Sequence, residues 1–283
     1  MHLTIDVFSG RPNPSWQLPV VVGRTVFELI NDSGLRLLTL PVPFPSRLGY
    51  RGLQIGLPID IVQKYRVSPL LDIPAVLIIE HLALFRELAG IVKFAGFLGI
   101  EELYKFVLLV IDLLQKTIAP PASGSPGATT TNPCPFEMLP FDPKPWNEGA
   151  YKPTNNCYAY ASNKRAKYPS KPQPGIGSGA MFSSLSGADV AAAAKRDGAH
   201  DVGDCFPDSE APRMLVALVI WPGNDYHWYR KHPDCWGHKP GSTDARNVDS
   251  SGAIIADPEK CDRGPYTVFH GYMLIPKSQK VAA

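Results

Sequence analysis

The sequence lacks a strong excess of charge of either sign. Its 28 lysines and arginines and 26 aspartates and glutamates give a formal net charge of +2 over 283 residues. Binding to nucleic acid depends on clustered lysine and arginine side chains that neutralise phosphates. Since no basic arm or basic block is present, we expect no nucleic-acid partner.

The sequence also lacks a secretory signal and a long apolar run. Residues 1–7 contain neither a basic segment nor an apolar one, so we do not expect classical export; a cytoplasmic protein and non-classical export stay as alternatives. The most apolar stretch, 73–118, is interrupted by charges and falls short of the ~20 residues that span a bilayer. We predict a helical hairpin there and no transmembrane span. A buried helix pair, a surface for self-association or partner binding, and an interfacial membrane helix all fit the pattern.

Cysteine is absent from the first 133 residues, and the spacings typical of zinc sites, C-x-x-C and H-E-x-x-H, are absent throughout. We therefore expect no metal and no cofactor; a zinc cage of Cys157, Cys235, His227 and His238 is the weaker alternative. Without an export signal, reduced thiols are the default expectation. The disulfide state of the four cysteines other than Cys157 stays open: Cys134, Cys205, Cys235 and Cys261.

What is abundant is proline, at 29 residues, which predicts a loop-rich chain. The length fits two domains. We place the first at 1–118, a small polar and proline-rich linker at 119–133, and the second at 134–283. The first is predicted to be α/β or mostly helical and to begin with a strand and a turn. The second is predicted to be α+β, with helices followed by an antiparallel sheet.

Periodicity and punctuation predict the elements within each domain. In the first domain we expect strands over 3–8 and 50–57, a turn over 9–14 and a helix over 20–30. In the second we expect an extended segment over 134–153 and helices over 156–167 and 188–196, the latter capped by Ser186. Strands are expected over the ranges 214–221, 226–231, 236–239, 253–256 and 267–275.

Cys157 is the candidate nucleophile. It follows Asn155 and Asn156, either of which can cap a helix through its side-chain oxygen. A thiol in the first helical turn is expected to ionise readily, because the free backbone amides and the helix dipole favour the thiolate. The same amides, with an asparagine side chain, could hold an oxyanion.

Two histidines are candidates for the partners of this thiol. His227 begins a predicted strand after a buried strand and a Pro-Gly turn, and His238 lies on the next one. If the strands pair, the imidazoles can be neighbours, so that His227 acts as a base that His238 orients. Alternatives for the third position are Asn247 or Asp249, and then Asp257. His232 is expected to be a solvated loop residue.

The order of a cysteine at a helix start, a histidine on a later strand and a polar residue about a dozen positions on resembles papain-like cysteine hydrolases. The spacing is most similar to NlpC-type and CHAP-type peptidoglycan amidases. The segments Asn-Asn-Cys-Tyr, Tyr-His-Trp-Tyr-Arg and His-Lys-Pro-Gly also resemble an uncharacterised bacterial family. The resemblance covers about 120 residues. It implies a papain-like fold, a peptide or peptidoglycan-like substrate, Cys157 as nucleophile, His227 as base and His238 as third member.

Aromatic residues surround these candidates. They fit ordinary sheet packing, or a groove in which Tyr158, Trp228 and Trp236 stack on substrate. The leading hypothesis is a cysteine peptidase or amidase that works through an acyl-enzyme. The alternatives are a non-catalytic binding or structural protein with an aromatic recognition surface, and an antibacterial effector toxin.

Overall fold

The computed structural model describes residues 1–6, 10, 13, 15–32, 52–67, 70–74, 84–85 and 133–283. No helix among these residues is long and apolar enough to cross a membrane. The chain divides into two compact units. The first comprises Met1–Val7, Asn13–Pro45 and Tyr50–Pro120, and the second comprises Phe8–Pro12, Ser46–Gly49 and Pro121–Ala283.

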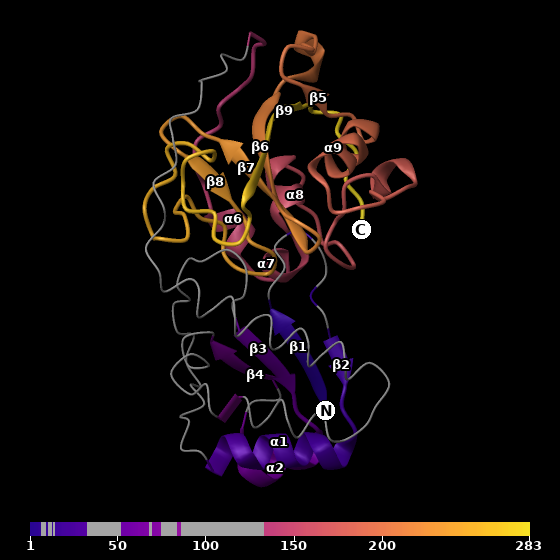
Figure 1. Ribbon diagram of the computed structural model, residues 1–283, viewed down its shortest axis with the longest axis vertical. Coiled ribbons are helices and arrows are strands. Elements are labelled where there is room, and N and C mark those ends of the chain that lie inside the picture. Colours follow the sequence, from indigo (N-terminus) through magenta and orange to yellow (C-terminus); the bar gives the residue numbers. More distant parts are fainter. Residues whose placement is uncertain are drawn as a thin grey trace. The chain divides into compact units, whose positions relative to one another are not determined.

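The described part of the first unit contains an antiparallel sheet and the helices α1 and α2 (Figure 1). The sheet has the order β2-β1-β3-β4, with β1 at His2–Asp6, β2 at Ser15–Gln17, β3 at Gly52–Gly56 and β4 at Leu70–Pro74. Helix α1 spans Val20–Asp32 and α2 spans Ile59–Tyr65. Helix α1 buries a stripe at helical spacing, formed by Gly23, Val26, Phe27 and Ile30.

The predicted strands at 3–8 and 50–57 and the helix at 20–30 correspond to β1, β3 and α1. The sequence did not predict β2, α2 or β4. The helical hairpin expected over 73–118 is wrong at its start, because Ile73 and Pro74 close β4. Apart from helical Leu84 and Phe85, the rest of it lies outside the described residues, as does the linker at 119–133 except for Pro133.

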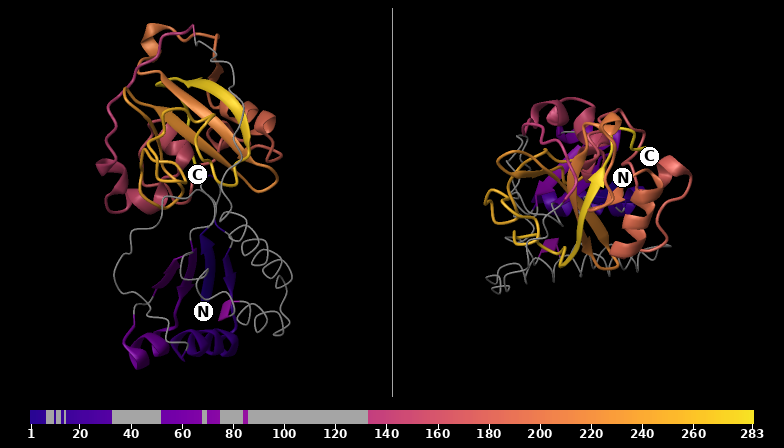
Figure 2. Two further views of the ribbon diagram at one scale, coloured as in Figure 1. Left: turned by 60° about the vertical axis from the view of Figure 1, so that its left-hand side comes forward. Right: turned by 90° about the horizontal axis from the view of Figure 1, so that it is seen from above.

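The second unit is built on a five-stranded antiparallel sheet of order β5-β9-β6-β7-β8 (Figures 1 and 2). The strands are β5 at His200–Asp201, β6 at Met214–Trp221, β7 at Asp225–Lys231, β8 at Trp236–His238 and β9 at Val268–Ile275. Within residues 133–283, four α-helices precede most of the sheet: α6 at Lys144–Asn147, α7 at Tyr151–Thr154, α8 at Cys157–Ala161 and α9 at Gly187–Arg196. Two short 3-10 turns lie at Ile176–Ser178 and Asp208–Glu210.

One face of this sheet carries the main core. Helix α8 packs on β7 and β8, and α9 packs on β6 and β9. Alternate residues of the strands meet the helices, as the two-residue period of a strand requires. The members of this core cluster include Val190 and Ala194 from α9, Val216, Leu218 and Ile220 from β6, Tyr226 and Trp228 from β7, and Met273 and Ile275 from β9.

Three predictions in the second unit need correction. The helix expected over 156–167 ends at Ala161, because Asn163 adopts a left-handed conformation with φ 52°. The segment 134–153 is not wholly extended, since it contains α6. The strand expected at 253–256 is reduced to one bridge, Val248 with Ile254. The helix at 188–196 is present, with the Ser186 hydroxyl accepting from the Asp189 amide at 3.1 Å.

Cys134 and Cys205 form a disulfide across a sequence separation of 71 residues. The expectation of reduced thiols is therefore wrong for this pair. Arg213 ties the same segments together: its guanidinium donates to Glu137 Oε1 at 2.7 Å and to Asp208 Oδ1 at 3.0 Å. The guanidinium lowers the pKa of Glu137, so the carboxylate stays ionised. Arg213 Nε also donates to Glu137 Oε2 at 3.3 Å, which makes the ion pair bidentate. The disulfide and this ion pair thus join residues 134–137 to the connection between β5 and β6.

Candidate functional site

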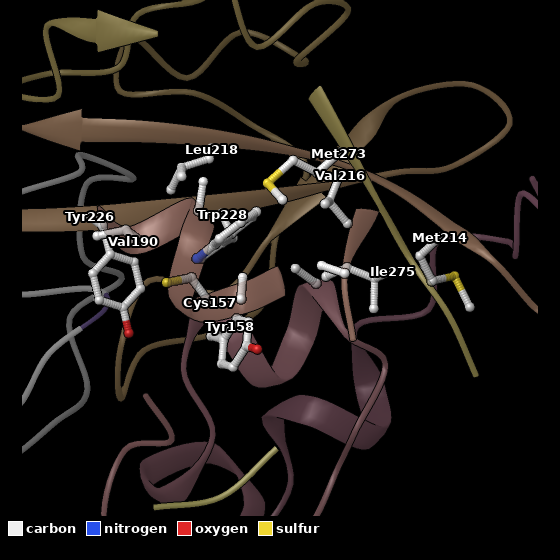
Figure 3. Packing of buried hydrophobic residues seen from close by; sticks show 14 of the residues in the cluster. Cys157, Tyr158, Val190, Met214, Val216, Leu218, Tyr226, Trp228, Met273 and Ile275 are labelled. Atoms are coloured by element: carbon white, nitrogen blue, oxygen red, sulfur yellow. The ribbon is translucent and has the colours of Figure 1, made fainter. Parts of the chain in front are cut away.

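Cys157 lies in the core rather than in an open cleft. Its side chain is completely buried, and its sulfur points between the rings of Trp228 and Tyr226 (Figure 3). Of the two asparagines expected as alternative caps, Asn156 caps α8, with its Oδ1 accepting from the Ala159 amide at 3.2 Å. The helix brings the cysteine to the sheet but presents it to hydrocarbon.

The expected readily ionised thiol is therefore wrong. Burial raises the pKa of Cys157 well above its ordinary value, and the nearby Asp225 carboxylate raises it further. The backbone of Trp228 and of Tyr158 opposes this only in part. A five-residue helix contributes a small dipole, so burial decides the protonation state, and the sulfur is a neutral thiol at neutral pH.

The structure does not bring Cys157 and His227 together as a pair. Tyr226 and Trp228 of β7 contact the cysteine cluster, and successive side chains of a strand point to opposite faces. His227 therefore points to the other face of the sheet. There it contacts the rings of Tyr229 at 4.8 Å and Tyr266 at 5.7 Å between centroids.

His227 and His238 are neighbours, as the sequence predicted. His227 Nε2 lies 2.8 Å from His238 Nδ1, and His238 Nε2 lies 2.9 Å from the carbonyl oxygen of Val248. A carbonyl only accepts, so His238 carries its proton on Nε2 and its Nδ1 accepts from His227. Burial, reinforced by the charge of Arg246, lowers the pKa of His238 well below its ordinary value and keeps the ring neutral. The pair forms an ordered, buried hydrogen-bond chain.

The other candidates for the third catalytic position form hydrogen bonds within and between loops. Asn247 donates to the Cys235 sulfur at 3.7 Å. Asp249 accepts backbone hydrogen bonds from Ser251 and Ala253, and Asp257 accepts from the hydroxyl of Tyr272 at 2.9 Å.

Asn155 is also a structural residue. Its amide group donates to the carbonyls of Tyr151 at 2.9 Å and Ala166 at 2.7 Å, and its oxygen accepts from the Ala166 amide. Its side chain therefore has no donor directed at Cys157. The Nδ2 of Asn156 donates to the carbonyls of Gly10 and Pro172.

The predicted substrate groove is not open. Tyr158 and Trp228 are fully buried in the core, and Tyr158 donates to Asp197 at 2.8 Å. Trp236 is 5% exposed and packs on Tyr272. The sheet-packing alternative describes these aromatic residues better than the groove does.

Several polar residues that the sequence did not single out are buried here. His232, expected in solvent, has no exposed surface and lies 2.8 Å from both the Tyr160 hydroxyl and the Leu139 carbonyl. Lys239 is buried and donates to three carbonyls, those of Lys152, Asn155 and Gly241. No local pattern marks either residue, because all of these partners except Gly241 are distant in sequence.

Across residues 133–283 and the shorter described stretches, no group of three or more histidine, cysteine, aspartate or glutamate side chains could hold a metal ion.

No family model matches the chain, and no solved structure matches it. The chain is 43% identical over 134 residues to insoluble matrix shell protein 1 of Ruditapes philippinarum, covering 47% of this chain and 87% of that relative. The chain belongs to the family of that shell matrix protein.

Membership in the shell matrix protein family corrects the predicted function. The relative's name describes a component of an insoluble matrix, which agrees with the structural alternative and contradicts the peptidase or amidase hypothesis. In this family member the buried Cys157 and the opposite orientation of His227 agree with that correction. The papain-like fold stays a prediction.

Proposed function

We propose that the protein is a non-catalytic structural protein that becomes part of an insoluble matrix. The observation that carries this proposal is the 43% identity to a shell matrix protein across 87% of its length. An identity of this size supports a shared fold and a shared role over the matched residues.

The disulfide supports the same proposal. Disulfides persist in oxidising settings such as the extracellular space and are rare in the cytosol. A bond between Cys134 and Cys205, reinforced by Arg213, favours a module that stays folded outside the cell.

Sequential extraction of the source tissue tests the proposal. We expect an antibody against residues 133–283 to detect the protein in the residue left after buffer and detergent, and to lose it only after denaturant. An abundant soluble matrix-independent protein, probed in the same fractions, is the control for incomplete washing. Complete recovery of the protein in the first buffer fraction would overturn the proposal.

Thiol labelling tests its non-catalytic part. Iodoacetamide at neutral pH should modify Cys261 first, because this thiol is partly exposed, and leave the buried Cys157 unmodified until the protein is unfolded. Burial raises the pKa of both thiols, so access to the reagent sets the order. Mass spectrometry of the peptides gives the order, and Cys235, a second buried thiol, is the matched control. Selective modification of Cys157 in the folded protein would contradict the structural role.

A further inference from the structure

Both backbone polar groups of Gly10 are held by side chains of the second unit. The Gly10 carbonyl accepts from Asn156 Nδ2 at 2.5 Å, Gln173 Nε2 at 2.9 Å and the Tyr226 hydroxyl at 3.2 Å. The Gly10 amide donates to Asp225 Oδ2 at 3.2 Å. All five residues are buried. Three donors and one acceptor thus converge on the main chain of a single residue.

This arrangement is held in place by contacts that do not involve Gly10. The Asn156 oxygen caps α8, and its amide also donates to Pro172 at 2.8 Å. Asp225 accepts from the Tyr266 hydroxyl at 2.5 Å. The Tyr226 hydroxyl has a single proton, which the Gly10 carbonyl shares with the Gln173 oxygen at 3.1 Å. Groups fixed in advance lose little entropy when a ligand arrives, which is the property of a preorganised binding site.

The site accepts only glycine at this position, because there is no room for a side chain. A Cβ added to Gly10 would lie 2.6 Å from Cε2 of the Tyr226 ring and 2.6 Å from the Tyr226 carbonyl oxygen. The carbonyl belongs to the backbone of β7 and cannot move aside without disturbing the sheet. Any other residue at this position must shift the main chain and loosen the four hydrogen bonds.

The occupant comes from far away in the sequence. Gly10 is 146 residues from Asn156, so the site is not formed by a local turn. The entropic cost of closing a loop rises only slowly with its length, so the chain's own distant segment acts as a ligand at a finite effective concentration. When copies of the protein are crowded, the same segment of a second copy reaches a comparable concentration and competes for the site.

We propose that Asn156, Gln173, Asp225 and Tyr226 form a glycine-selective peptide-binding site whose ligand is the main chain at Gly10 of this protein. The chain's own Gly10 occupies the site here. In a matrix, a second copy of the protein supplies the glycine, and this exchange links the two copies. This part of the inference rests on the proposed function.

Peptide binding to a full-length variant tests the site. In Gly10→Val the chain's own segment no longer fits, so a labelled peptide of residues 5–16 should bind it at least about tenfold more tightly than it binds the wild-type protein. The same peptide carrying Gly10→Ala should bind at least about tenfold more weakly, and the added substitution Gln173→Leu should abolish binding. The control chain is Gly56→Ala, whose Cβ would lie 3.4 Å from the His2 Cβ, an ordinary contact. Equal binding of both peptides would overturn the site.

A measurement on the wild-type protein covers the case in which Gly10→Val does not fold. Excess peptide should displace the resident segment and increase amide hydrogen exchange at Gly10. Unchanged exchange at saturating peptide would overturn the proposal.

Complementation tests the exchange between copies. Gly10→Val has an empty site, and Gln173→Leu has an intact segment, so their mixture should form a one-to-one complex by sedimentation while each alone stays monomeric. No complex, with peptide binding intact, would overturn the exchange alone. Peptide binding by a protein that extraction recovers as soluble would overturn the matrix function and leave the site standing.

Discussion

Removing the disulfide should cost the second unit a large part of its stability. The bond closes a loop of 71 residues. Restricting a loop of that length in the unfolded chain stabilises the folded state by roughly 4 kcal/mol according to the chain-entropy relation. Replacing both Cys134 and Cys205 with Ala releases that restriction and removes little packing, because each residue is small.

Urea unfolding followed by tryptophan fluorescence measures the loss. All tryptophans except Trp16 lie in the second unit, so Trp16→Phe makes the signal specific to it. With a urea dependence of about 2 kcal/mol per molar, the midpoint of the double variant should fall by about 2 M. The wild-type protein in reductant should behave like the variant, and Cys261→Ala, which changes a free thiol, should change little. A midpoint within about 0.5 M of the wild-type value, equal to roughly 1 kcal/mol, would refute the loop argument.

Two further predictions concern buried basic side chains. Burial lowers the pKa of His232 to about 4, below its ordinary value of 6.5, so the unfolded chain binds the proton first and stability should decline as the pH falls from about 6.5 towards 4. The urea midpoint measured against pH should flatten in His232→Gln, and an unchanged slope would exclude this histidine as the cause. Lys239→Met should lower the free energy of unfolding by roughly 3 kcal/mol or more, because it leaves three carbonyls without their donor. The same urea assay measures it, and a loss below about 1 kcal/mol would show that water replaces the ammonium group.

The central strands could be predicted because their sequences leave few alternatives. The run Met214–Trp221 is apolar throughout and is bounded by Pro222 and Gly223, and the pairing of Asp225–Lys231 with Trp236–His238 brings the two histidines together as expected. The helix caps Asn156 and Ser186 could also be predicted, since each places a short polar side chain before an apolar turn.

The orientation of β7 could not be predicted. A half-buried strand shows its inner face by alternating apolar and polar residues. In β7 both faces are buried, and the large residues Tyr226, His227, Trp228 and Tyr229 follow one another without alternation. The sequence therefore did not indicate which residues face Cys157. If the odd-numbered residues of β7 faced Cys157, His227 would lie beside the thiol. Because the even-numbered residues face it, Cys157 and His227 are buried on opposite faces of the sheet.

The contacts of Gly10 could not be predicted from the sequence either, because local patterns do not indicate distant partners. The turn chemistry of residues 9–14 predicts a change of chain direction and nothing about a partner more than a hundred residues away. Its partners also looked ordinary: Gln173 lies between prolines, and Asp225 follows a turn. Contacts between loops depend on the three-dimensional path of the chain, which local periodicity does not encode.

The asparagine before Cys157 explains why catalysis and binding are hard to separate from sequence. An oxyanion site and a site for a peptide carbonyl need the same donors, an amide side chain beside a helix start. What separates them is the position of the nucleophile. Asn156 directs its donor to the carbonyl of Gly10, whereas the sulfur of Cys157 is buried between Trp228 and Tyr226 with a raised pKa. A site that holds a carbonyl without an ionised nucleophile keeps its peptide, which agrees with the proposed structural role.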